Sequence, residues 1–187
     1  MDRMIGWLRT RDNEVLFWAN RRPVHRRTHK WLGRWLSTIT HMGGATFTLA
    51  TALLAALLAP APWHTTGWQC VAAVAISHIP VAIVKRKFKR LRPYQAFPEV
   101  NTCLRPLQDS SFPSGHTTAI FAWLTPILLT DGLWYAVVVP AAVIAGVSVG
   151  WSRMYLGLHY PSDVAAGAVL GSLTALIVNY SWLSSSI

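Results

Sequence analysis

Three short groups of polar residues, each beside a hydrophobic stretch, hold the residue types needed for phosphoryl chemistry. Cations and backbone amides bind phosphate oxygens, whereas a histidine can attack phosphorus or protonate a leaving oxygen. The sequence therefore predicts a phosphate site assembled from three groups: Lys85 with Arg92, the segment from Ser114 through Gly115 to His116, and Arg153 with His159 and Asp163.

The first group is the basic run KRKFKRLRP, in which Lys85 and Arg92 lie seven positions apart. Arginine offers a planar fork to two phosphate oxygens and lysine acts as a point charge, so the pair suits a phosphomonoester or a diphosphate. Pro93 stops a helix that would continue through the run. Taken alone, the run also fits a juxtamembrane basic cluster that contacts lipid head groups.

The second group is Pro113-Ser114-Gly115-His116, where the next apolar stretch begins. Ser114 is placed as an N-cap and Gly115 permits close backbone approach, so the free amides at this helix start would face a phosphate. His116 is then positioned to protonate the leaving oxygen. A capped helix start with an interfacial histidine is the alternative interpretation.

The third group contains Ser152-Arg153, His159 and Asp163, and Pro161 marks the first turn of the last apolar helix. A carboxylate bonded to one ring nitrogen of His159 would leave the other free to attack phosphorus, and Arg153 would complete the cationic cradle. As an isolated pair, His159 and Asp163 would more often form a local capping interaction.

The elements that position these groups are apolar blocks, since 52% of the 187 residues are hydrophobic. A helix that crosses a bilayer needs about 20 apolar residues. Five segments approach this length, which predicts an all-α polytopic membrane bundle that forms one domain over residues 1–187: Leu36 to Ala59, Trp68 to Val84, Ser114 to Leu129, Leu133 to Trp151 and Val164 to Leu183.

Residues 1–35 form a basic segment that we expect to lie in the membrane interface. An apolar stripe predicts an N-terminal amphipathic helix, although Asp12 interrupts the stripe and a frayed basic tail is the alternative. No secretory signal peptide is expected, because no apolar core with a cleavage site follows the first charges. The stripe consists of Ile5, Trp7, Leu8, Val15, Leu16 and Trp18.

Charge distribution predicts which side of the membrane holds the site. With five spans, the N-terminal segment, the loop 85–112 and the turn 152–163 share one face, and all 17 Lys and Arg lie there. The positive-inside rule makes that face cytoplasmic. The net charge of +10 is accompanied by no nucleic-acid motif, so anionic lipid is the expected partner and nucleic acid is not.

Several other polar residues receive no catalytic assignment. Cys70 and Cys103 show neither a disulfide framework nor metal-ligand spacing, so no metal or cofactor is expected. His78 lies within an apolar stretch and is a candidate for a helix-to-helix hydrogen bond or a functional role. Head-group selection is expected in the loop 94–112, where the sequence does not rank Gln95, Glu99, Asn101, Arg105 and Asp109.

The strings KRKFKRLRP, PSGH and SRMYLGLHYPSD together resemble the three signature motifs of the type 2 phosphatidic acid phosphatase (PAP2) family. The resemblance covers residues 85–163. It implies a metal-independent mechanism in which His159 forms a phosphohistidine, Asp163 orients it and His116 protonates the departing group. Lys85, Arg92, Ser114, Gly115 and Arg153 would hold the phosphoryl oxygens.

The resemblance also sets the alternatives. It implies an integral membrane lipid phosphatase acting on phosphatidic acid, phosphatidylglycerol phosphate or a polyprenyl phosphate or diphosphate, and many members of the family have six spans. An outward-facing undecaprenyl-diphosphate phosphatase, a lipid phosphotransferase and a non-enzymatic lipid-binding or transport protein are the competing hypotheses. The oligomeric state is left open.

Overall fold

The computed structural model describes residues 2–21, 26–102, 106–130 and 135–184. All regular secondary structure within these residues is helical, which confirms the predicted all-α fold class. The elements are α1 (Asp2–Asn20), α2 (Arg26–Ile39), the 3-10 turn η1 (Thr40–Gly43), α3 (Ala45–Leu58), α4 (Trp63–Lys87), α5 (Pro93–Ala96), α6 (Gly115–Leu128), α7 (Tyr135–Tyr155) and α8 (Pro161–Ser184).

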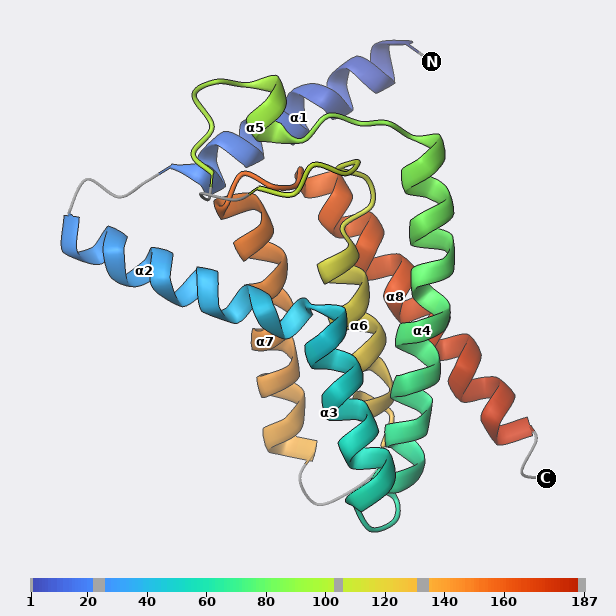
Figure 1. The fold of residues 1–187 in the computed structure, drawn as a ribbon. Coiled ribbons are helices and arrows are strands. Elements are labelled where there is room, and N and C mark those ends of the chain that lie inside the picture. Colours follow the sequence, from blue (N-terminus) through green and yellow to red (C-terminus); the bar gives the residue numbers. More distant parts are fainter. Residues whose placement is uncertain (1, 22–25, 103–105, 131–134, 185–187) are drawn as a thin grey trace.

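Helix α6 lies at the centre of the bundle and contacts α3, α4, α7 and α8 (Figure 1). Small residues allow this close packing: a Cβ atom on Gly171 of α8 would lie 2.3 Å from the carbonyl oxygen of Thr118 in α6. Ala73 of α4 and Ala119 of α6 are fully buried beside it. Close approach of helices through small residues is the usual packing mode in membranes.

Three helices of the structure, α4, α7 and α8, are long and apolar enough to cross a membrane, and they coincide with three of the predicted spans. The span predicted over 36–59 is instead broken at η1, where the chain bends by 57°. Gly43 and Gly44 lie at this bend, and glycine weakens a helix interior. The span predicted over 114–129 contains α6, whose 14 residues are shorter than a typical span.

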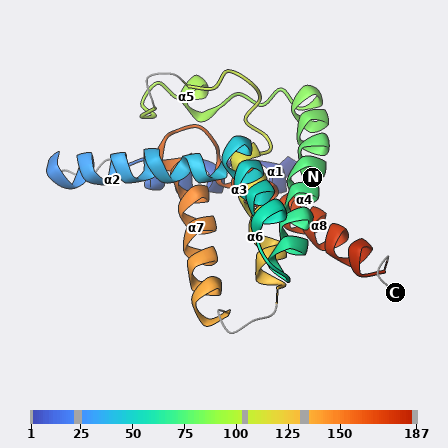
Figure 2. The ribbon, with the colours of Figure 1, turned by 60° about the horizontal axis from the view of Figure 1, so that its bottom comes forward.

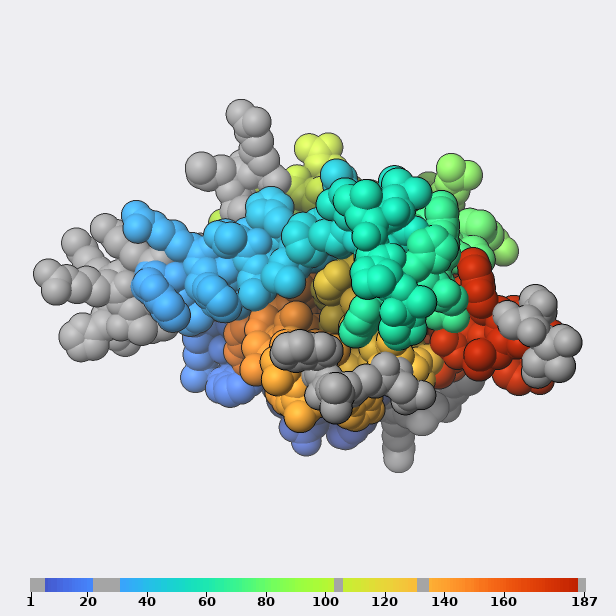
Figure 3. All heavy atoms as spheres, turned by 90° about the horizontal axis from the view of Figure 1, so that it is seen from below, coloured from blue at the N-terminus to red at the C-terminus, as the bar shows by residue number. Residues whose placement is uncertain are grey.

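The N-terminal segment forms two helices rather than one. Helix α1 lies across one end of the bundle, and α2 projects sideways from it (Figures 1 and 2). Seen from the opposite end, α2 extends beyond the outline of the bundle (Figure 3). Its Trp31 and Trp35 are exposed and stack on each other at 6.2 Å. This placement suits a helix that lies in the membrane interface, where tryptophan is enriched.

Only part of the predicted apolar stripe packs α1 against the bundle. Leu16 is fully buried, whereas Trp7, Leu8, Val15 and Trp18 are exposed. The side chain of Ile5 lies outside the described side chains. Helix α1 is therefore docked through one edge and presents aromatic and aliphatic side chains outward, as an interfacial helix does.

Candidate active site

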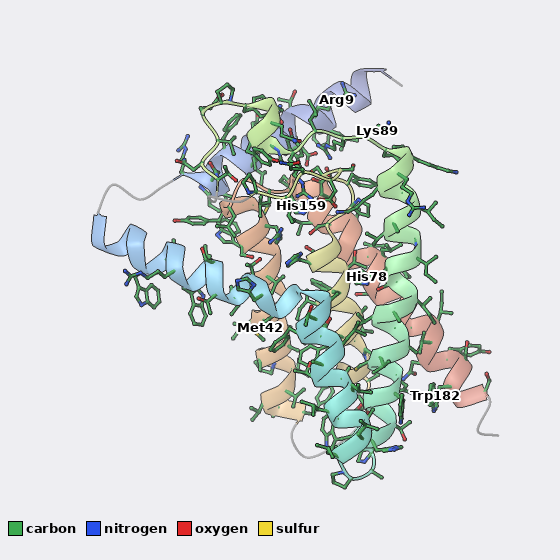
Figure 4. The ribbon with its side chains drawn as sticks, viewed as in Figure 1. Arg9, Met42, His78, Lys89, His159 and Trp182 are labelled. Atoms are coloured by element: carbon green, nitrogen blue, oxygen red, sulfur yellow. The ribbon has the colours of Figure 1, made fainter. Side chains whose placement is uncertain are left out.

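The three predicted groups meet at the end of the bundle that carries α1 and α5 (Figure 1). The backbone amide of Ser114 donates to the carbonyl oxygen of Asp163 over 3.0 Å, which joins the second group to the third. Arg92 is fully buried and donates from Nη1 to the Nε2 atom of His159 over 3.1 Å, which joins the first to the third. Figure 4 shows His159 at this end, far from Trp182.

His159 is held as a neutral imidazole with its Nε2 lone pair toward Arg92. The Nδ1 atom lies 2.7 Å from the carbonyl oxygen of Ser111, which can only accept, so Nδ1 carries the proton. Arginine can only donate, so Nε2 accepts. Burial and the positive charges of Arg153 and Arg92 lower the pKa of His159 to about 4, although Asp163 acts in the opposite direction. An unprotonated Nε2 is the form that can attack phosphorus.

Asp163 lies beside His159, the partner that the sequence predicted, at ion-pair distance and not at hydrogen-bond distance. Its Oδ2 atom lies 3.6 Å from Nδ1 of the histidine, and the Nδ1 hydrogen bond goes to Ser111 instead. The carboxylate accepts hydrogen bonds from Ser111 Oγ at 2.5 Å, the Tyr160 amide at 2.8 Å and Arg90 Nη1 at 2.8 Å. Asp163 is therefore linked to His159 in two ways: directly at 3.6 Å, and through Ser111, whose hydroxyl donates to the carboxylate and whose carbonyl oxygen accepts from Nδ1.

An anion already bridges the two predicted phosphate-binding cations of the first group. Asp109 accepts from Lys85 Nζ through Oδ2 at 2.5 Å and from Arg92 Nη2 through Oδ1 at 2.6 Å. Although partial burial raises its pKa, the hydrogen bonds and charges of Lys85 and Arg92 lower the pKa of Asp109 to about 2. The carboxylate thus marks the region between Lys85 and Arg92 as one that attracts negative charge.

The other loop residues have different environments. Gln95 accepts a hydrogen bond from the Arg92 amide through Oε1 at 2.8 Å, which fixes the backbone of that arginine. Asn101 donates its amide to Asn20 of α1 over 2.8 Å. Glu99 is exposed, and Arg105 lies outside the described residues. The sequence did not rank these residues, whereas the structure separates Asp109 from the rest.

Ser114 is the N-cap of α6, as predicted: its hydroxyl accepts from the Thr117 amide and, at 2.9 Å, from the Thr117 hydroxyl. Gly115 is the first residue of the helix, and a Cβ atom there would meet only Val81, at 4.0 Å. Backbone amides at a helix start suit an anion.

His116 and Arg153 line a cavity of about 260 Å³ together with residues from η1 and the turn between α7 and α8. Arg153 is buried and donates from Nη1 to the Thr40 hydroxyl over 2.8 Å. His116 and Arg153 thus come from different helices to one accessible space. The lining residues are Ser37, Thr40, His41, Leu107, His116, Arg153, Leu156 and Leu158.

Helix α1 reaches the site through Asp12, the residue that interrupts its apolar stripe. Asp12 accepts from the Ser162 amide at 2.9 Å and from Arg90 Nη2 at 2.7 Å. Arg90 bridges Asp12 to Asp163 and lies 3.9 Å over the Tyr160 ring. In the sequence, the role of Asp12 was indicated only by its being a carboxylate in an otherwise apolar stripe. Arg90 could not be told apart from the other cations of the basic run.

The remaining polar candidates lie apart from this site. His78 lies midway along the bundle (Figure 4), and its Nδ1 is 2.8 Å from the Val74 carbonyl of its own helix, so the contact found is not the helix-to-helix bond expected. Cys70 is buried and directs its thiol to the Trp123 carbonyl. Cys103 lies outside the described residues, within which no cluster of three His, Cys, Asp or Glu forms a metal-ligand set.

Comparison with known proteins identifies the family. The sequence profile of the PAP2 superfamily matches residues 66–185, which is more than half of the chain. The chain belongs to the PAP2 superfamily. The identification made from the three motifs is thereby confirmed, and the match ends well after the third motif.

Individual relatives of this PAP2 protein are bacterial and archaeal. The bacitracin transport permease protein BcrC of Bacillus licheniformis is 37% identical over 112 residues, 58% of this chain and 51% of that protein. The undecaprenyl-diphosphatase of Sulfolobus acidocaldarius is 34% identical over 107 residues, which are 57% of this chain and 50% of that protein. The match therefore spans about half the length of these relatives. The decaprenylphosphoryl-5-phosphoribose phosphatase of Mycobacterium tuberculosis is 32% identical over 134 residues, which are 70% of this chain and 69% of that protein.

Two solved structures share the fold. The crystal structure of Aquifex aeolicus LpxE gives a TM-score of 0.75 with 22% identity, and covers 89% of this PAP2 chain and 93% of its own. A PAP2-type phosphatidylglycerolphosphate phosphatase from Bacillus subtilis gives 0.75 with 23% identity, covering 95% and 87%. This PAP2 chain thus shares its overall helical fold with both structures.

Proposed function

We propose that this PAP2 protein is an integral membrane phosphatase that removes a terminal phosphate from an anionic lipid through a phosphohistidine. The observation that carries the proposal is the buried, neutral His159, with Nε2 beside Arg92. A nucleophile with its lone pair held next to a cation attracts the anionic group that it must attack. The chain would act as one domain, with residues 85–163 supplying the chemistry.

In the proposed first step, the substrate phosphate takes over the hydrogen bond that Arg92 Nη1 makes to His159 Nε2. The freed Nε2 lone pair attacks phosphorus, and the bond from phosphorus to the leaving oxygen breaks. Lys85, Arg92 and Arg153, with the Ser114 hydroxyl and the Gly115 amide, hold the three remaining phosphoryl oxygens, where charge must be stabilised. His116 takes up a proton as the negative charge of the substrate enters the site, and then gives that proton to the leaving oxygen. Water then gives a proton to His116 and attacks the phosphohistidine, which releases inorganic phosphate and restores both Nε2 and the protonated His116. Asp163 and Ser111 hold the His159 imidazole in the same orientation through both steps.

The Asp109 carboxylate defines what a substrate must replace. Its oxygens lie between Lys85 and Arg92, so a phosphate that uses both cations must displace the carboxylate or share them with it. A substrate phosphate carries up to two negative charges against one on the carboxylate, which favours the exchange. The cations therefore need not remain unpaired before substrate arrives.

The substrate class proposed is a lipid phosphate or diphosphate in the membrane. Two relatives are named as an undecaprenyl-diphosphatase and a decaprenylphosphoryl-5-phosphoribose phosphatase, and a structural neighbour as a phosphatidylglycerolphosphate phosphatase. These names support polyprenyl and glycerol lipids alike.

A second cavity of about 720 Å³ lies between α4 and α8, away from His159. It is lined mainly by apolar residues such as Ile76, Ile177 and Val178.

The deciding experiment is a panel of lipid phosphates assayed for release of inorganic phosphate, with His159→Ala beside the wild type. We expect release from at least one lipid, and its loss in the variant while substrate binding is largely kept. A lipid phosphotransferase would instead label a second alcohol without free phosphate. A binding or transport protein would keep its function in His159→Ala, and either result would reject hydrolysis. Vanadate, a mimic of the transition state, should inhibit.

For sidedness, we propose that the active face is cytoplasmic, supported by the placement of all 17 Lys and Arg. Glu99 is exposed in the loop at the site end, and His64 is exposed at the opposite end of α4. In a Cys103→Ser background, Glu99→Cys should resist an impermeant thiol reagent in intact cells and His64→Cys should react. The reverse pattern would place the site outside, as an outward-facing undecaprenyl-diphosphate phosphatase requires.

A further inference from the structure

A fourth segment, the turn η1, is built into the active site although it carries none of the three motifs. A Cβ atom on Gly43 would lie 2.8 Å from the His116 carbonyl oxygen and 2.6 Å from Val149 Cγ1, so only glycine lets the turn approach this closely. At the other end of the turn, Thr40 is buried and accepts the hydrogen bond from Arg153 at 2.8 Å. The turn is thus fixed against both His116 and Arg153.

His41 lies between these two anchors and lines the 260 Å³ cavity together with His116 and Arg153. Its side chain is exposed, so it is accessible to a ligand that enters the cavity. An imidazole can donate a hydrogen bond from a ring nitrogen in either protonation state. His41 therefore offers a donor that neither the catalytic steps nor the hydrogen bonds of the fold have assigned.

The composition of the cavity wall indicates the ligand chemistry. Among the described lining residues, the titratable groups are His41, His116 and Arg153, and no carboxylate is present. The remaining wall combines two hydroxyl side chains, Ser37 and Thr40, with three leucines at 107, 156 and 158. Such a wall favours an anionic group attached to an apolar chain over a neutral polar one.

The direction of the reaction places the leaving group here. In the proposed mechanism His116 protonates the leaving oxygen, so whatever is bonded to that oxygen lies on the His116 side of phosphorus. A lipid monophosphate departs as a neutral alcohol, whereas a lipid diphosphate departs as a lipid monophosphate with charged oxygens. Only the second leaving group has charged acceptor oxygens for a further donor beside His116 and Arg153.

We propose that His41 is a specificity-determining residue that donates a hydrogen bond to the leaving phosphate of a lipid diphosphate. This inference rests on the proposed phosphatase function and deepens it. It assigns Thr40 as a positioning residue for Arg153, and Gly43 as the residue that allows η1 to reach the site. Diphosphates gain the His41 contact and monophosphates do not.

The test compares kcat/KM for a polyprenyl diphosphate and for phosphatidic acid in the purified full chain. We expect His41→Ala to lower kcat/KM for the diphosphate by about tenfold or more, the effect of losing one hydrogen bond to a charged group. The value for phosphatidic acid should stay within about twofold, because a neutral leaving alcohol gives His41 no charged acceptor. His41→Lys should retain most of the diphosphate activity, since lysine restores a donor. His64→Ala, an exposed histidine at the opposite end of α4 and outside the cavity lining, is the matched control and should leave the ratio unchanged.

A second measurement covers a wild type that acts on diphosphates alone. Inhibition by pyrophosphate should weaken in His41→Ala while inhibition by inorganic phosphate stays constant. Equal losses for both substrates, equal losses for both inhibitors, or no loss at all would each overturn the role of His41. A wild type that hydrolyses only monophosphates would also overturn it. A wild type that releases phosphate from no lipid would reject the phosphatase function itself, so the two failures are distinguishable.

Discussion

Arg92 and His159 are joined by a 3.1 Å hydrogen bond from Nη1 to Nε2, with both side chains buried. The same guanidinium also donates to the Leu158 carbonyl from Nη1 and to Asp109 from Nε and Nη2. Arg92 therefore fixes the tautomer of His159 and the loop that carries Asp109 at once. Arg92, predicted to bind phosphate, therefore also holds three neighbouring residues of the site in place.

This geometry predicts that charge alone cannot replace Arg92. Arg92→Lys keeps one positive charge but lacks the planar fork that reaches Leu158, His159 and Asp109 together. We expect kcat/KM to fall by roughly a hundredfold, as for loss of an electrostatic contact at a reacting group. Lys89→Arg, at an exposed position of the same basic run, is the control and should retain activity. Full activity in Arg92→Lys would contradict the role.

The depressed pKa of His159 predicts how stability depends on pH. Its pKa in the folded protein is about 4, below the ordinary 6.5. As pH falls below 6.5 the unfolded chain binds a proton that the folded chain does not, so stability present above pH 6.5 is progressively lost toward pH 4. Thermal unfolding in detergent at pH 7.5 and pH 5 should show this loss, and His159→Gln should reduce it. An identical loss in the variant would assign it to other groups.

The ion-pair chain from α1 predicts an effect of the N-terminal helix on turnover. Asp12→Asn weakens the hold on Arg90 and thereby on Asp163, so we expect kcat to fall by about threefold to tenfold with KM little changed. Arg90→Gln should have a larger effect in the same direction, because it removes the direct bond to Asp163. Arg11→Gln breaks the exposed pair with Glu14 and the cation–π contact with Trp7, neither of which involves Arg90 or Asp163, and should leave kcat unchanged. A change confined to KM would argue against positioning.

The contact of η1 with α6 predicts a size limit at Gly43. Gly43→Ala would force the His116 backbone or Val149 to move, and overpacking of this kind costs roughly 1–3 kcal/mol. We expect a lower unfolding temperature and reduced activity on every lipid. Gly6→Ala, where a new Cβ atom meets nothing within 4 Å, is the matched control. A stable and fully active Gly43→Ala protein would show that η1 is not fixed as described.

Much of the site was predictable because its residues cluster in the sequence. Lys85 and Arg92, Ser114 to His116, and Arg153 to Asp163 are each local groups whose chemistry is complete enough to suggest phosphate binding. The N-cap at Ser114 followed from local rules alone. The partners Asp12, Thr40, His41 and Ser111 were missed, because each is an ordinary polar residue until the chain folds.

Composition and short-range spacing were enough to predict the all-α class, the apolar spans in α4, α7 and α8, and the residue types of the proposed phosphate site. Three features depend instead on tertiary packing: the break of the predicted 36–59 span at η1, the Ser111 link between Asp163 and His159, and the bridge that Asp109 makes between Lys85 and Arg92. Differences of about an ångström in the distances between side chains decide which hydrogen bonds form, and packing between segments distant in the sequence sets those distances.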